Sequence, residues 1–234
     1  MNLKKIAAAA AIAIGSMGAA QAATIVKVAV PTFDIPGLTG FSTDGSEMTG
    51  LSIRAVFSGG GGLDETRAWA TTGVGSGGVS GTGWGLSVSG DTFAASAWSF
   101  VMDPAASLGQ LTMLVIDAAP SLTILDTTSP SSGSPGSASG LDFSMADAAD
   151  AFAVATYTNM VTIGGAAAVT DLFQTLTVTF TADANGGLTG PRSSFRFSQD
   201  TDNDSRFGSV PEPGTLALVG LAIAGLGFGA RRRS

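Results

Sequence analysis

The stretch that decides the fold is FQTLTVTFT, residues 173–181, in which apolar and polar side chains alternate. Leu176, Val178 and Phe180 fall on one side of the chain, and threonines separate them on the other. A period of two residues, with many β-branched side chains, is typical of a strand with one buried face. The stretch therefore predicts a β-strand.

Similar patterns recur along the chain. TGLSIRAVF, residues 49–57, alternates in the same way, and LTMLVID, residues 111–117, is apolar on both faces, which is typical of a central strand. Glycine-rich turns are predicted between the strands, for example at 58–62 and 75–85. Further strands are predicted at residues 24–30, 66–72, 84–89, 96–102, 110–117, 152–163 and 193–198.

Many short strands joined by glycine-rich turns predict a mainly β protein, an antiparallel β-sandwich of the jelly-roll kind spanning residues 23–209. Trp69, Trp84 and Trp98 lie in or beside predicted strands. We expect them to pack in the core, and the alternative is an exposed aromatic platform that binds sugars.

Two segments depart from the strand pattern. TTSPSSGSPGSASG, residues 127–140, has no apolar side chain larger than alanine, which predicts a flexible loop. MADAADAFAVA, residues 145–155, is the helical candidate of the body, because its acidic residues come early, where the helix dipole favours them.

The first 22 residues have the layout of a secretory signal peptide. Lys4 and Lys5 precede an apolar run at 6–14, and Ala20 and Ala22 are small residues at the positions that signal peptidase inspects. The sequence therefore predicts export, with cleavage after Ala22.

The other end of the chain carries a second apolar segment, residues 215–230, which contains no charge. As a helix it would be roughly 24 Å long, short of a hydrocarbon core of roughly 30 Å. The three arginines that follow can extend to the headgroups, and such residues stay on the cytoplasmic side. We predict a single transmembrane helix at 215–230 with the body outside the cell and with its cytoplasmic end at Arg231, Arg232 and Arg233.

Before this helix the chain reads VPEP, and prolines on both sides of a glutamate keep the backbone extended and outside any helix. With the apolar segment and the arginines, residues 210–234 resemble the PEP-CTERM sorting signal of Gram-negative bacteria. The resemblance implies recognition by exosortase, an integral-membrane cysteine peptidase, followed by removal of the tail and passage to the cell surface or matrix. The matching motif residues are Val210, Pro211, Glu212 and Pro213.

Composition narrows what the body can do. Residues 23–209 hold six basic and 17 acidic side chains, a formal net charge of −11, which argues against nucleic acid as a partner. The chain has no cysteine and no histidine, so disulfides and histidine-dependent nucleophilic catalysis are excluded. Carboxylate chemistry and cations with oxygen ligands remain.

A cluster of carboxylates lies near the end of the body, in SQDTDNDSRFG, residues 198–208. Asp200, Asp202 and Asp204 alternate there, and closely spaced carboxylates are ligands that calcium prefers. The pattern departs from an EF-hand, with Ser205 where glycine belongs and Pro211 where glutamate belongs. We therefore weigh a looser calcium turn, with calcium as the one cofactor considered, against a solvated acidic linker, which the sequence favours.

Asp64 and Glu65 follow a glycine run and could form part of a glycosidase pair. Such enzymes need a second carboxyl group roughly 5–9.5 Å away across a cleft. The sequence indicates no partner, and we predict that the protein is not an enzyme.

The resemblance implies a structural or adhesive role in an exopolysaccharide matrix. The first alternative is a carbohydrate-binding module assisted by calcium, and the second is a glycoside hydrolase that uses aspartate and glutamate.

Overall fold

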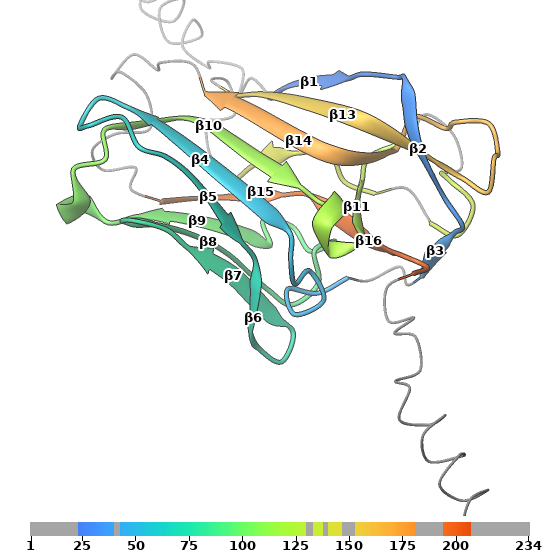
Figure 1. Cartoon of the computed structure of the whole chain (residues 1–234), viewed down its shortest axis with the longest axis horizontal. Helices are drawn as coiled ribbons and strands as arrows, with labels where there is room; N and C mark the ends of the chain where they lie inside the picture. Colours follow the sequence, from blue (N-terminus) through green and yellow to red (C-terminus); the bar gives the residue numbers. More distant parts are fainter. Residues whose placement is uncertain are drawn as a thin grey trace, which may run out of the picture.

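The computed structural model describes residues 23–39, 43–129, 133–137, 140–146, 153–180 and 194–206. This part of the chain folds into two β-sheets that lie face to face (Figure 1). Two short 3-10 helices, η1 (Pro104–Ala106) and η2 (Ala119–Ser121), are the helical elements of the described residues. The mainly β prediction is confirmed.

The first sheet contains ten strands, seven of which form one continuous series. In spatial order the series is β3 (Leu38–Thr39), β16 (Asp200–Asp204), β11 (Thr123–Asp126), β14 (Leu172–Phe180), β10 (Gln110–Asp117), β4 (Ser52–Ser58) and β5 (Asp64–Ala68). Three further strands join through β14: β13 (Ala153–Ile163) pairs with β14, and β1 (Thr24–Lys27) and β2 (Pro31–Ile35) pair with β13.

The second sheet contains six strands, all paired antiparallel. Its order is β12 (Ser144–Met145), β15 (Ser194–Ser198), β9 (Trp98–Met102), β8 (Trp84–Ser89), β7 (Ser76–Ser80) and β6 (Ala70–Gly73). The chain passes from the first sheet to the second at Trp69, between β5 and β6, and this indole is buried.

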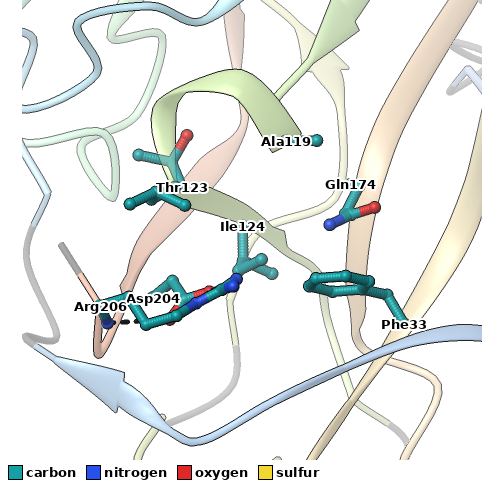
Figure 2. Close-up of a pocket in the computed structure, with 8 residues that line it drawn as sticks. Phe33, Ala119, Thr123, Ile124, Gln174, Asp204 and Arg206 are labelled. Atoms are coloured by element: carbon teal, nitrogen blue, oxygen red, sulfur yellow. Dashed lines mark hydrogen bonds and ion pairs between the residues drawn. The ribbon is translucent and has the colours of Figure 1, made fainter.

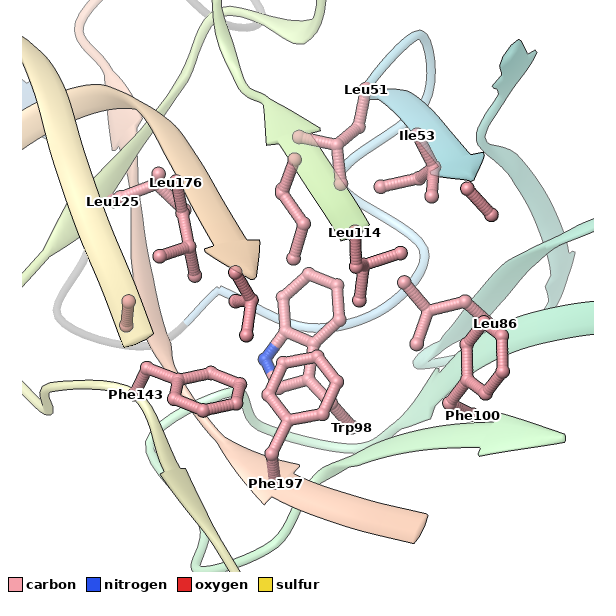
Figure 3. Close-up of a cluster of buried hydrophobic side chains, with 14 of the residues drawn as sticks. Leu51, Ile53, Leu86, Trp98, Phe100, Leu114, Leu125, Phe143, Leu176 and Phe197 are labelled. Atoms are coloured by element: carbon pink, nitrogen blue, oxygen red, sulfur yellow. The ribbon is translucent and has the colours of Figure 1, made fainter. Parts of the chain in front are cut away.

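The core forms where the alternating faces of the two sheets meet. Trp98 of the second sheet is fully buried and stacks on Phe197 with ring centroids 5.5 Å apart. Leu114 and Leu176 of the first sheet belong to the same buried cluster (Figure 3). Trp69 and Trp84 are buried as well, so the prediction that the tryptophans pack in the core is confirmed.

Several predicted strands match the structure closely. The predictions at 84–89 and 110–117 coincide with β8 and β10, and β10 lies between β14 and β4, as expected for a central strand. The predicted turn at 75–85, in contrast, contains a strand, β7. A Cβ atom on Gly77 would lie 2.0 Å from the Gly45 carbonyl oxygen, so glycine here permits close approach of two backbones.

Other predictions need correction. Met145 and residues 153–155, the ends of the expected helix at 145–155, lie in β12 and β13, and residues 147–152 lie outside the described residues. The sandwich is not purely antiparallel, because β1 and β2 both run parallel to β13. The expected solvated linker at 200–204 is instead strand β16, and all five of its residues are buried.

Both processed ends of the chain lie outside the described residues. This applies to the signal peptide with Ala20 and Ala22, to the sorting motif at 210–213, and to the helix predicted at 215–230 with its three arginines. In the part of the chain that the structure describes, no helix is long and apolar enough to cross a membrane.

Candidate metal centre

Two neighbouring strands bring three aspartates together. In the antiparallel pair of β11 and β16, Asp126 lies directly opposite Asp200, and Asp202 lies two residues further along β16. Side chains two residues apart on a strand share a face, and directly opposed residues on paired strands do so too. The register therefore places all three carboxylates on the same face of the sheet.

These carboxylates are close together and shielded from water. One oxygen of each lies within 4.8 Å of the other two. The residues Asp126, Asp200 and Asp202 are 1%, 4% and 1% exposed. We call this group the aspartate cluster. It contains two of the predicted calcium ligands, together with Asp126, which the sequence analysis did not select.

Hydrogen bonds satisfy only part of the aspartate cluster. Asp200 Oδ1 accepts hydrogen bonds from the Thr201 backbone N–H at 2.8 Å and from Thr92 Oγ1 at 3.1 Å. Ser137 Oγ donates to Asp126 Oδ2. Two buried oxygens, Asp126 Oδ1 and Asp202 Oδ2, have no hydrogen-bond partner within the described part of the chain.

The segment expected to be a flexible loop, residues 127–140, packs against the aspartate cluster in its described parts. Ser134 is buried, and its backbone N–H and hydroxyl donate to the two carboxylate oxygens of Asp171 at 2.7 and 2.6 Å. Gly140 is so close that a Cβ atom there would lie 2.5 Å from the backbone carbonyl of Asp126. Small polar residues can join an interior when their polar groups are bonded, which the prediction of a flexible loop overlooked.

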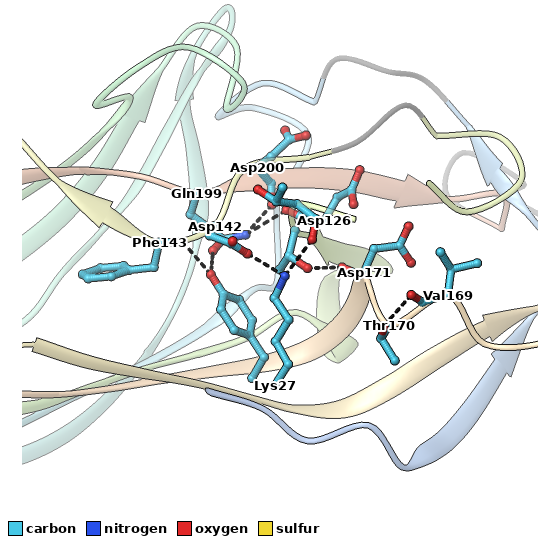
Figure 4. A network of polar contacts seen from close by, with 12 residues as sticks. Lys27, Asp126, Asp142, Phe143, Val169, Thr170, Asp171, Gln199 and Asp200 are labelled. Atoms are coloured by element: carbon cyan, nitrogen blue, oxygen red, sulfur yellow. Dashed lines mark hydrogen bonds and ion pairs between the residues drawn. The ribbon is translucent and has the colours of Figure 1, made fainter. Parts of the chain in front are cut away.

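Positive charge near the cluster is directed elsewhere. Lys27 Nζ lies 2.8 Å from Asp142 Oδ1 and donates to the Thr128 carbonyl oxygen (Figure 4). Among the ion pairs between described residues, none includes a member of the aspartate cluster.

Burial therefore dominates the titration of the three carboxyls. It raises the pKa of Asp126 to about 8, that of Asp200 to about 7 and that of Asp202 to about 6, and neighbouring carboxylates add to each increase. Burial acts in this direction because it disfavours the charged form.

Asp204, the third predicted ligand, does not join the aspartate cluster. Its carboxylate forms an ion pair with Arg206, whose guanidinium carbon lies 5.4 Å from the centre of the Phe33 ring. These side chains line a pocket of about 260 Å³ (Figure 2). Because the guanidinium covers the ring, Phe33 does not offer a free stacking surface for a sugar.

The predicted glycosidase candidates lie on β5, away from the aspartate cluster, and both are held by neighbours. Asp64 forms a two-pronged pair with Arg54, with distances of 2.7 and 2.6 Å, which holds the pKa of Asp64 below its usual value.

Glu65 is held differently. Its Oε2 accepts hydrogen bonds from the Thr82 backbone N–H at 2.8 Å and from Trp84 Nε1 at 2.7 Å. Burial alone would raise the pKa of Glu65, but the hydrogen bonds that it accepts outweigh burial and lower it. A carboxyl with a lowered pKa is poorly suited to act as a general acid near neutral pH.

A shallow groove of about 250 Å³ lies on the second sheet, over β7, β8 and β9. It contains no aromatic side chain, and hydroxyl groups and small residues line it, among them Ser80, Ser87 and Ser99.

One sequence signal could have pointed to Asp126. It ends an apolar run, TILD, residues 123–126, immediately before the segment rich in serine and glycine. The pairing of this run with residues 200–204 spans more than 70 residues of chain and has no local signature.

Comparison with known proteins identifies the tail. A family model described as the PEP-CTERM protein-sorting motif matches residues 209–233, which confirms the resemblance seen in the sequence. No curated protein and no solved structure matches the chain. The chain thus carries an exosortase sorting motif, which implies export and sorting through the membrane, whereas the sandwich itself matches no known protein.

Proposed function

We propose that this protein is a structural or adhesive component of the cell surface or exopolysaccharide matrix, delivered there by exosortase. The observation that carries the proposal is the PEP-CTERM motif at 209–233, which begins five residues after β16, the last described strand. A stable β-sandwich followed by a removable sorting segment is an arrangement that suits a protein released to the exterior.

The proposal excludes catalysis by the candidate pair. Asp64 and Glu65 are both engaged by neighbouring side chains, and Arg54 neutralises the first of them. We expect no turnover in a polysaccharide-degradation assay. Turnover that Asp64→Asn or Glu65→Gln abolishes would contradict this part of the proposal.

The test of the sorting proposal is the C-terminal peptide of the protein from its native host, identified by mass spectrometry. We expect a C-terminus near residues 210–214, with the apolar segment and the arginines removed. An intact tail ending in Arg233 and Ser234 would instead make the segment a permanent anchor. The matrix role would then lose its main support.

Carbohydrate binding is the second candidate function, and the groove on the second sheet is the observation that favours it. Its serines and threonines could donate to and accept from sugar hydroxyls, although no aromatic platform accompanies them. A glycan array with the wild-type chain and with a Ser87→Val, Ser99→Val double variant tests it. Binding that the double variant loses would support this function, and the absence of binding would contradict it.

A further inference from the structure

The unpartnered oxygens of the aspartate cluster indicate a missing positive charge. Asp126 Oδ1 and Asp202 Oδ2 are buried and accept no hydrogen bond in the described part of the chain. A buried carboxylate is strongly disfavoured unless it is paired, hydrogen-bonded or bound to a metal. No lysine or arginine of the described residues forms an ion pair with the cluster.

The spacing of the cluster suits one ion bound by all three carboxylates. Calcium binds oxygens at 2.3–2.6 Å, so two oxygens on the same ion lie at most about 5 Å apart. In the structure, one oxygen from each of the three aspartates lies within 4.8 Å of the others. Three carboxylates can therefore reach a single ion without a change in the register of β11 and β16.

The ligand set selects the kind of ion. The ligands are carboxylate oxygens, and the chain has no cysteine or histidine, the ligands that zinc and copper favour. Magnesium demands near-ideal octahedral geometry and keeps several waters, which a closed site accommodates poorly, whereas calcium accepts irregular oxygen cages. We propose that Asp126, Asp200 and Asp202 bind one calcium ion.

Such an ion would fasten the end of the sandwich. Asp126 belongs to β11, whereas Asp200 and Asp202 belong to β16, which precedes the sorting motif. Ser137, from the segment that covers the cluster, donates to Asp126. Calcium therefore joins the strand that leads to the sorting motif, its neighbouring strand and the covering segment. The inference concerns the body alone and does not depend on the matrix role.

Calorimetry with the full-length chain tests the proposal. The protein, held in mild detergent and stripped with EGTA, is titrated with calcium chloride and, separately, with magnesium chloride. We expect one calcium ion per chain, with a Kd of about 10⁻⁵ to 10⁻³ M, the range of sensor and extracellular sites. Magnesium is expected to bind at least tenfold more weakly.

Two variants distinguish the proposed ligands from the alternating set in the sequence. Asp126→Asn keeps the shape and the acceptor for Ser137, and should weaken calcium binding at least tenfold. Asp204→Asn removes a carboxylate from the same strand that pairs with Arg206, and should leave calcium affinity unchanged. Far-ultraviolet circular dichroism confirms that each variant is folded, and hydrogen exchange of residues 199–205 should slow when calcium binds to the wild type.

Three results would overturn the proposal: no calcium binding by the folded wild type at about 10 mM calcium, wild-type affinity in Asp126→Asn, or loss of binding in Asp204→Asn alone. Each of them would leave the sorting proposal standing, because the C-terminal peptide is measured independently. Failure of the sorting proposal would equally leave the calcium result intact.

Discussion

Two groups of acidic side chains in this molecule are stabilised in different ways. On β5, Asp64 is half exposed and pairs with Arg54, and Glu65 accepts hydrogen bonds from neighbouring side chains and backbone. In the aspartate cluster the carboxylates are buried without a protein cation. The comparison shows that the pKa of Asp64 falls and the pKa values in the cluster rise, so the two regions should respond to pH in opposite directions.

The largest expected effect is the pH dependence of the calcium-free protein. Unfolded aspartates titrate near pH 4, whereas Asp126, Asp200 and Asp202 titrate at about 8, 7 and 6 in the fold. Between these limits the folded state binds more protons, so the stabilising effect of protonation is present below pH 4 and is lost as the pH rises to 8. Each proton changes the free energy of unfolding by about 1.4 kcal/mol per pH unit.

Urea unfolding in EGTA between pH 5 and pH 8 measures this slope. The acids surrounding the cluster, Asp91 and Asp171, should steepen it because their charges disfavour ionisation. Calcium should flatten the profile, since it binds the ionised carboxylates. Stability that rises with pH in EGTA would contradict the contrast between the two regions. Asp64, with its lowered pKa, contributes in the opposite sense, and its contribution is lost only as the pH falls below about 4.

A smaller effect is expected from the cover of the aspartate cluster. Gly140→Ala places a methyl group against the backbone of Asp126, at 2.5 Å from its carbonyl, and should lower the free energy of unfolding by about 1–3 kcal/mol. The matched control is Gly73→Ala on β6, where a Cβ atom meets nothing within 4 Å. Equal stability of the two variants in urea unfolding would mean that the covering segment does not pack as described.

The smallest effect is expected at the exposed pair. Asp64→Asn removes the charge that Arg54 pairs with, and both side chains are nearly half exposed, so water and salt already screen the interaction. We expect the Tm to change by less than about 2 °C. A larger loss, insensitive to salt, would indicate that the pair on β5 is as critical as the buried cluster.

The strands that the sequence predicted well share a local signature. β8 and β10 coincide with their predicted ranges because apolar residues in each repeat at strand spacing or run on both faces. β7 was missed because its glycines are selected by the close approach of Gly45 and by the nearby Trp69 indole, contacts that arise only in the folded chain.

The aspartate cluster was half predicted for a similar reason. Alternation placed Asp200 and Asp202 on one face, and this followed from local spacing alone. Asp126 enters through the pairing of β11 with β16, a non-local contact, and Asp204 leaves because Arg206 is two residues away. The sorting motif, in contrast, is a contiguous segment that is read locally, and the family model confirms it.

The most direct test of the account is the Tm of wild type and Asp126→Asn, each measured in EGTA and in about 5 mM calcium at pH 8. The account predicts a reversal. Without calcium the variant is more stable, because it carries one buried charge fewer, and with calcium the wild type is more stable, because only it holds the ion. A wild type that is more stable in both conditions, with an equal calcium response in the two proteins, would contradict the account.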